Sequence, residues 1–223
     1  MNALHTHLSR TLAPALARQL ALADLLGERG WQVDISAGTV TFGDDLTYPI
    51  QLLGTESHGD QTWLWAWANS GIQIPPALLR AAEWLRGYGR EHGIPELTEA
   101  SHPLDRADGH LLALLAGGLT GQCYYRGPYQ GGALFFLVEQ APAVVTAPAA
   151  PQRVLTVLTQ AIQMYPVDHR TLVDSFLRQQ DYAVTATQDD VSGQRSDGST
   201  IRVSFDPQGR ITNLAGALRP ADV

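Results

Sequence analysis

Leucines recur about every fourth position through the first part of the chain, with polar residues between them. This spacing fits one face of an amphipathic helix over residues 3–29. Because proline cannot donate its backbone N–H, Pro14 is expected to start or kink this helix. We therefore predict a stable helix over 14–28, ended by Gly30. The leucines that form the stripe are Leu4, Leu8, Leu12, Leu16, Leu20, Leu25 and Leu26.

The pattern then changes from a helical period to the alternation that is typical of strands. Short turns separate the alternating segments, which predicts an antiparallel meander. Pro75 and Pro76 open a predicted helix, and Asp108 is placed to cap another. The predicted strands are 31–35, 39–42, 47–55, 61–68, 122–127 and 132–138, and the predicted helices are 76–92 and 109–117.

A proline- and alanine-rich stretch without charge, residues 141–151, is typical of a linker. After it the pattern predicts helices at 151–164 and 168–180 and strands at 181–188, 191–196, 200–206 and 209–215. The predicted fold is α+β, an antiparallel sheet packed by helices and followed by a smaller αα-ββββ unit. The predicted domains are residues 1–140 and 152–223.

The segment QTWLWAWAN, residues 61–69, combines three tryptophans with an apolar second face. Period two places Trp63, Trp65 and Trp67 on one face of a strand, and leucine and alanine on the other. A strand without a polar face is typical of the covered centre of a sheet, so these indoles are expected in the core. Alternatively, one indole edge lines a pocket. Trp67, close to the polar Asn69, is the indole most expected to meet solvent or a ligand.

The net charge of −7 and the pI near 5.4 argue against a nucleic-acid or anionic-membrane partner, because both need a basic surface. A basic protein partner is allowed, as is a plain solvated acidic surface. The N-terminus has no basic region, Arg10 and Arg18 interrupt its apolar run, and no segment approaches a membrane span. A cytoplasmic location is therefore expected.

The best candidate for an interaction site is the predicted hairpin that contains Tyr124, Tyr125, Arg126 and Tyr129 between glycines. Tyrosine and arginine dominate protein recognition surfaces, since both offer large contact area with directed hydrogen bonds. The alternative is that Tyr125 belongs to the core and Arg126 pairs with a nearby carboxylate. The sequence leaves both interpretations open.

Catalytic and metal chemistry receive little support. The seven histidines are scattered, and His5 and His7 lack the spacing of a helical metal pair. The single cysteine, Cys123, excludes an internal disulfide and is expected to be a buried, inert thiol. Ser57 and His58 are adjacent but lack a nucleophile elbow. We expect no catalytic residues, no metal and no cofactor.

Four further segments of the chain stand out: LLGTESHGDQTWLWAWAN (52–69), LLRAAEWLRGYGREHGIPELTE (78–99), DGHLLALLAGGLTG (108–121) and YYRGPYQGGALFFLV (124–138). Together they resemble an uncharacterised family of bacterial proteins, a domain of unknown function built around a tryptophan-rich strand. The resemblance covers about residues 15–140 and implies a common fold without an established activity.

The favoured function is a non-enzymatic protein-binding module, of the inhibitor or immunity type, that binds an unidentified protein partner. The alternative is a small-ligand-binding protein or enzyme. Its pocket would lie between the sheet and the 109–117 helix, lined by Trp67, Asn69 and Tyr124. Self-association into a homo-oligomer is a third interpretation.

Overall fold

The computed structural model describes residues 2–217 and divides the chain into two compact units. One unit is formed by residues 18–145. The other combines the chain up to residue 17 with the part that begins at residue 146. The sequence-based boundaries at 140 and 152 stay a prediction, because compactness alone does not show which part folds independently.

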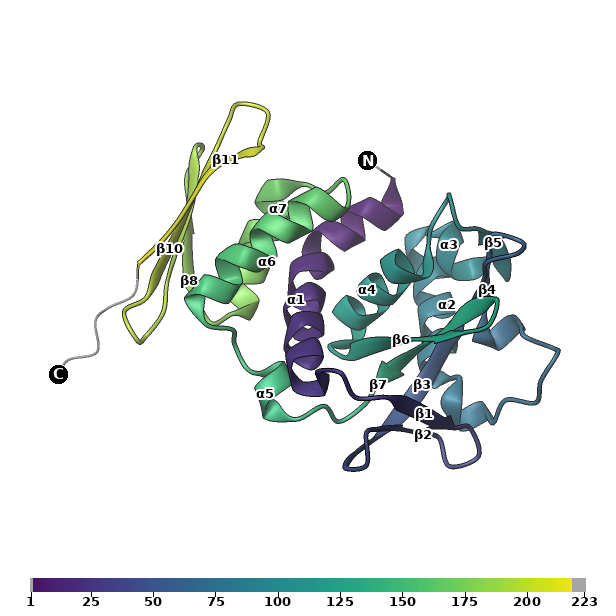
Figure 1. Ribbon diagram of the computed structural model, residues 1–223. Coiled ribbons are helices and arrows are strands. Elements are labelled where there is room, and N and C mark those ends of the chain that lie inside the picture. Colours follow the sequence, from purple (N-terminus) through teal and green to yellow (C-terminus); the bar gives the residue numbers. More distant parts are fainter. Residues whose placement is uncertain (1, 218–223) are drawn as a thin grey trace. The chain divides into compact units, whose positions relative to one another are not determined.

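The first helix, α1 (Ala3–Leu26), stays helical across Pro14, and Figure 1 shows a bend in its axis. Leu12 and Leu16, on either side of the proline, are both buried, so side-chain packing offsets the missing backbone hydrogen bond. The helix ends where Gly27 adopts a φ of +54°, a left-handed conformation that favours glycine. The amphipathic pattern over 3–29 is thus confirmed, whereas the narrower helix over 14–28 closed by Gly30 was wrong, because the helix begins at Ala3 and ends before Gly27.

The unit of residues 18–145 contains a seven-stranded sheet in which all pairs are antiparallel. The long strand β3 organises the sheet, because it pairs with β2 at its beginning, with β7 from Ile50 onward and with β4 from Gly54 onward. The strands are β1 (Trp31–Asp34), β2 (Thr39–Phe42), β3 (Leu46–Ser57), β4 (Thr62–Trp65), β5 (Ser101–Pro103), β6 (Cys123–Tyr129) and β7 (Gly132–Val138).

Capping residues close in sequence mark the ends of two helices of this unit. The carboxylate of Asp108 accepts a hydrogen bond from the Leu111 N–H at 2.7 Å, which caps α4. Gly93 ends α2 in a left-handed conformation. The helical segments are η1 (Ala66–Ala68), η2 (Pro76–Leu78), α2 (Arg80–His92), α3 (Pro95–Thr98), α4 (Gly109–Thr120) and α5 (Ala143–Thr146).

The tryptophan-rich segment is core, as predicted, but it is a shorter strand than predicted. Trp63 and Trp65 are fully buried, and their rings meet edge to face at 5.3 Å. Pairing of β4 with β3 ends at Trp65, so the chain beyond it has no ladder partner and coils into the 3₁₀ turn η1. Trp67 consequently leaves the face that Trp63 and Trp65 share, and the prediction of one strand over 61–68 was wrong.

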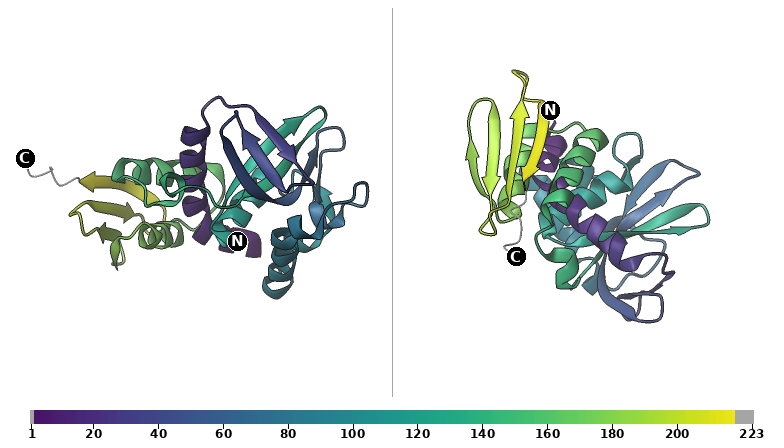
Figure 2. Two further views of the ribbon diagram at one scale, coloured as in Figure 1. Left: turned by 90° about the horizontal axis from the view of Figure 1, so that it is seen from below. Right: turned by 60° about the vertical axis from the view of Figure 1, so that its left-hand side comes forward.

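The other unit contains the first part of α1, the two helices α6 and α7, and a four-stranded antiparallel sheet in the order β11-β10-β9-β8. The inward residues of this sheet, Val191, Ile201 and Val203, are buried. Figure 2 shows α6 and α7 on one side of the sheet. The elements are α6 (Pro151–Met164), α7 (His169–Gln179), β8 (Ala183–Ala186), β9 (Asp190–Gln194), β10 (Thr200–Phe205) and β11 (Ile211–Ala217). The predicted α+β class with an αα-ββββ unit is confirmed.

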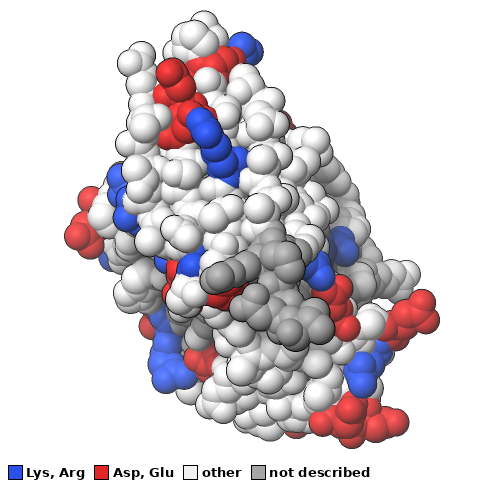
Figure 3. Space-filling model, turned by 90° about the vertical axis from the view of Figure 1, so that its left-hand side faces the viewer, with Lys and Arg blue, Asp and Glu red and all other residues white. Residues whose placement is uncertain are grey.

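Charged side chains are mixed in sign on the side of the molecule where β8–β11 lie. Figure 3 shows arginine and acidic side chains scattered there among uncharged ones. Several form local pairs, such as Arg202 Nη2 with Asp190 Oδ2 at 2.8 Å and Arg210 Nε with Asp206 Oδ2 at 2.7 Å. Exposed pairs of this kind contribute little to stability.

Candidate functional site

Two hairpin turns meet at one end of the seven-stranded sheet. The backbone N–H of His58, after β3, donates to the carbonyl of Gly131, between β6 and β7, at 2.9 Å. This contact follows from the pairing of β3 with β7, which continues to Ser57 and Gly132. We use the name sheet-end surface for the side chains of Glu56, His58, Arg126 and Tyr129.

A buried carboxylate supports this surface. Glu56 is only 6% exposed, and its Oε1 accepts a hydrogen bond from the Gly109 N–H at 2.8 Å, at the start of α4. Its Oε2 lies 3.8 Å from Nε of Arg126, whose Nη2 lies 3.4 Å from Nε2 of His58. A helix N-terminus and a guanidinium both stabilise a buried negative charge. The Arg126 guanidinium is therefore held between the buried Glu56 and the exposed His58.

The tyrosines of the hairpin divide between the surface and the core. Tyr129 is 50% exposed, and its hydroxyl donates to the Glu56 carbonyl at 3.5 Å. Tyr124 is buried with its hydroxyl 2.8 Å from Nδ1 of His110, and burial raises the pKa of its phenol well above the ordinary value. Tyr125 faces the opposite side of the sheet, where its ring centroid lies 4.8 Å from that of Phe42.

Arg126 and Tyr129 thus contact Glu56 separately, Arg126 at its carboxylate and Tyr129 at its backbone carbonyl. They are three positions apart on a strand that pairs regularly with β7, so their side chains lie on opposite faces of β6. Tyr124 and Tyr125 pack against other rings of the unit. Arg126 also has the carboxylate partner that the alternative interpretation expected. Neither Glu56 nor His58 was part of the predicted site. The contact between Glu56 and Gly109 spans 53 positions of the sequence, and nothing in the local pattern indicates it.

The other two predicted residues, Trp67 and Asn69, lie elsewhere. The guanidinium carbon of Arg86 sits 3.9 Å from the centre of a Trp67 ring, a cation–π contact with α2. The amide oxygen of Asn69 accepts a hydrogen bond from the Gly71 N–H at 2.9 Å. Tyr124 instead contacts His110 on α4. The predicted set of Trp67, Asn69 and Tyr124 is thus held by separate local contacts.

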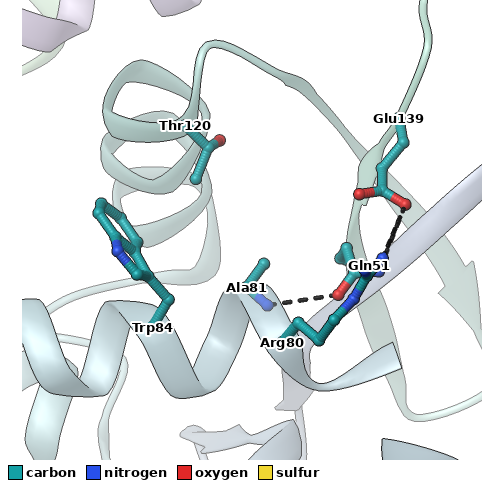
Figure 4. A pocket seen from close by; sticks show the side chains of 6 residues that line it. All are labelled: Gln51, Arg80, Ala81, Trp84, Thr120 and Glu139. Carbon is teal, nitrogen blue, oxygen red and sulfur yellow. Dashed lines mark hydrogen bonds and ion pairs between the residues drawn. The ribbon is translucent and has the colours of Figure 1, made fainter. Parts of the chain in front are cut away.

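A second candidate site is a surface hollow of about 220 Å³ beside α2 (Figure 4). We call it the Trp84 hollow, and sequence reasoning missed it. The helical period places Trp84 beside the buried face of α2 and outside it. An exposed tryptophan at such a position could have indicated a binding site from the sequence. The polar residues of the hollow could not be grouped from neighbouring positions of the sequence, because Gln51 and Glu139 lie 88 positions apart. The hollow is lined by Gln51, Arg80, Ala81, Trp84, Thr120 and Glu139.

Other reactive groups are buried or dispersed. Cys123 is buried, and burial raises the pKa of its thiol to about 11, although nearby Arg18 opposes this shift. Among residues 2–217, no group of three or more histidine, cysteine or acidic side chains is arranged to hold a metal ion. Across the same residues, every helix is too short or too polar to span a bilayer.

Comparison with known proteins gives one match. Searches of the curated proteins and of the solved structures find nothing similar. A family model described as a family of unknown function (DUF6882) matches residues 5–141, more than half of the chain and all seven strands of the sheet that carries both sites. The chain therefore belongs to the DUF6882 family of unknown function.

Proposed function

We propose that this chain is a non-enzymatic protein-binding module, of the kind used by inhibitors and immunity proteins, and that the sheet-end surface is its contact surface. The observation that carries the proposal is an Arg126 guanidinium held in place by Glu56 and His58 at the end of the sheet where Tyr129 is half exposed. Tyrosine and arginine are the residues most enriched among those that dominate binding energy.

Rigidity of this surface supports the same function. Holding a long side chain still on binding costs about 0.5–1.5 kcal/mol. The contacts of Arg126 with Glu56 and His58 restrict its guanidinium before any partner arrives, so less of this cost falls on association. The net charge of −7 favours a basic partner through long-range attraction.

The test begins with capture of a partner by the tagged full chain, followed by titration of the purified partner against wild type and variants. Tyr129→Ala removes an exposed ring, and Arg126→Lys keeps a charge beside Glu56 while it removes the planar fork. Arg126→Ala is less suitable, because it would leave the buried Glu56 carboxylate without its cationic partner and lower the stability of the fold.

We expect each substitution to weaken binding by at least about tenfold, and their combination by more. Arg90→Ala, which changes an exposed arginine of α2, is the matched control and should bind like wild type. Melting temperatures measured in parallel verify that each variant is folded. An unchanged dissociation constant for the double variant would show that the contact surface lies elsewhere.

A further inference from the structure

An aromatic ridge runs along the exposed side of α2. Trp84 is 49% exposed, and its ring centroid lies 5.4 Å from that of Tyr88 at an angle of 30°. The ring of Tyr88 in turn contacts His92 at 4.1 Å. Residues four apart share one face of a helix, so the three rings support one another. The indole of Trp84 is therefore a large apolar plate that its neighbours hold in orientation.

Two polar side chains with fixed positions, Gln51 and Glu139, also line the hollow that Trp84 lines. Gln51 is only 3% exposed, and its Nε2 donates to the Ala77 carbonyl at 3.1 Å and to Oε2 of Glu139 at 3.3 Å. Its Oε1 accepts from the Ala81 N–H at 3.3 Å. These three hydrogen bonds use both the nitrogen and the oxygen of the Gln51 amide. Through Gln51 they connect Glu139 to the beginning of α2. The carboxylate thus has a defined position at the hollow without being buried.

The charges at the hollow cancel. Nη2 of Arg80 lies 3.7 Å from Oε2 of Glu139, so a guanidinium and a carboxylate face the same space (Figure 4). An anionic ligand would compete with Glu139 for Arg80, and a cationic ligand would compete with Arg80 for Glu139. A neutral ligand that both donates and accepts hydrogen bonds can use the two groups together. The Thr120 hydroxyl at the end of α4 donates to the Ala116 carbonyl at 2.8 Å, so toward a ligand its oxygen is an acceptor.

We propose that the Trp84 hollow binds a neutral carbohydrate, with one pyranose ring against Trp84. The C–H groups on one face of such a ring carry partial positive charge, which the negative face of an indole attracts. Its hydroxyl groups meet Glu139, Arg80 and Thr120, which supply the donors and acceptors that orient a small ligand. This site is separate from the sheet-end surface and does not depend on the function proposed for it.

The experiment follows the indole N–H signals of the ¹⁵N-labelled full chain by NMR, with Trp84 assigned through Trp84→Phe. The probes are neutral methyl hexopyranosides and neutral 1,4-linked disaccharides, and a sugar phosphate and choline represent the charged classes. We expect at least one neutral sugar to shift the Trp84 signal in a saturable manner at millimolar or lower concentration.

Two variants and one control make the test specific. We expect Trp84→Ala to weaken binding of that sugar by at least about tenfold, and Glu139→Gln to weaken it severalfold. Tyr129→Ala should leave sugar binding unchanged, just as Trp84→Ala should leave capture of a protein partner unchanged. The assignment is overturned if no neutral sugar moves the Trp84 signal, if Trp84→Ala binds as well as wild type, or if a charged probe binds more tightly.

Discussion

Gly109→Ala tests whether the sheet and α4 are packed as tightly as the buried Glu56 contact requires. A β-carbon at this position would lie 2.6 Å from two ring atoms of Phe135 and 2.9 Å from Oε1 of Glu56. Phe135 is fully buried and Glu56 nearly so, which leaves neither side chain free to move aside. The methyl group would therefore push α4 away from the sheet or displace the carboxylate from the Gly109 N–H.

The size of the effect follows from three contributions. Overpacking of a core costs about 1–3 kcal/mol, and weakening of a hydrogen bond to a buried charge costs about 1–3 kcal/mol. Alanine regains up to about 1 kcal/mol of helix propensity relative to glycine. The expected net loss is about 3 kcal/mol in the free energy of unfolding. With a urea m-value of about 2 kcal/mol/M, the midpoint should fall by about 1.5 M.

Tryptophan fluorescence is the appropriate signal, because all five tryptophans lie in the unit of residues 18–145. The matched control is Gly87→Ala on α2, where no atom lies within 4 Å of an added β-carbon. That substitution should raise stability by about 0.5–1 kcal/mol through helix propensity alone. If Gly109→Ala instead behaves like Gly87→Ala, the close contact between Gly109, Phe135 and Glu56 does not exist as described.

Three further substitutions or modifications test other parts of the chain. Because the thiol pKa of Cys123 is raised to about 11, only about a thousandth of it is ionised at pH 8, so maleimide should label native protein far more slowly than urea-unfolded protein. Asp108→Ala should cost about 1 kcal/mol, measured by urea unfolding, since it removes the cap of α4. Burial lowers the pKa of His169, whose Nδ1 accepts from the Ile211 N–H at 3.1 Å. As the pH falls, His169 therefore takes up its proton in the unfolded chain before it does so in the folded chain. The stability that neutral His169 contributes to the fold is complete above pH 6.5 and is lost as the pH falls through the folded-state pKa. His169→Gln should flatten that pH dependence in urea unfolding followed by circular dichroism.

Features that depend on neighbours in the sequence could be predicted. Asp108 caps α4 within its own turn, and the glycine after α2 adopts the left-handed conformation that ends a helix. The strands of the αα-ββββ unit follow from turns such as the one in which the Asp206 carboxylate accepts from the Arg210 N–H. Each of these contacts joins residues no more than four positions apart, so the local pattern carries all the required information.

The candidate sites depend on pairings across the sheet, which the local pattern does not contain. The alternation along residues 61–68 could not show that β3 stops pairing with β4 at Trp65, so Trp67 was placed on the wrong face. Likewise, the predicted interaction site grouped Tyr124, Tyr125, Arg126 and Tyr129 as one surface. In the sheet, Tyr124 and Arg126 share the face of Phe135 with Glu56 from β3, whereas Tyr125 and Tyr129 lie on the other face.

A single irregularity in β3 links the two candidate sites. Gln51 and Glu56 are five residues apart, and in a regular strand an odd separation places side chains on opposite faces. The pairing with β7 shifts between Leu52 and Gly54, so Gln51 lies opposite Leu137 and Glu56 opposite Ala133. These partners are four residues apart on an unbroken strand and share a face, so Gln51 and Glu56 share it too. The bulge therefore directs both buried polar side chains toward helices, Gln51 to the start of α2 and Glu56 to the start of α4.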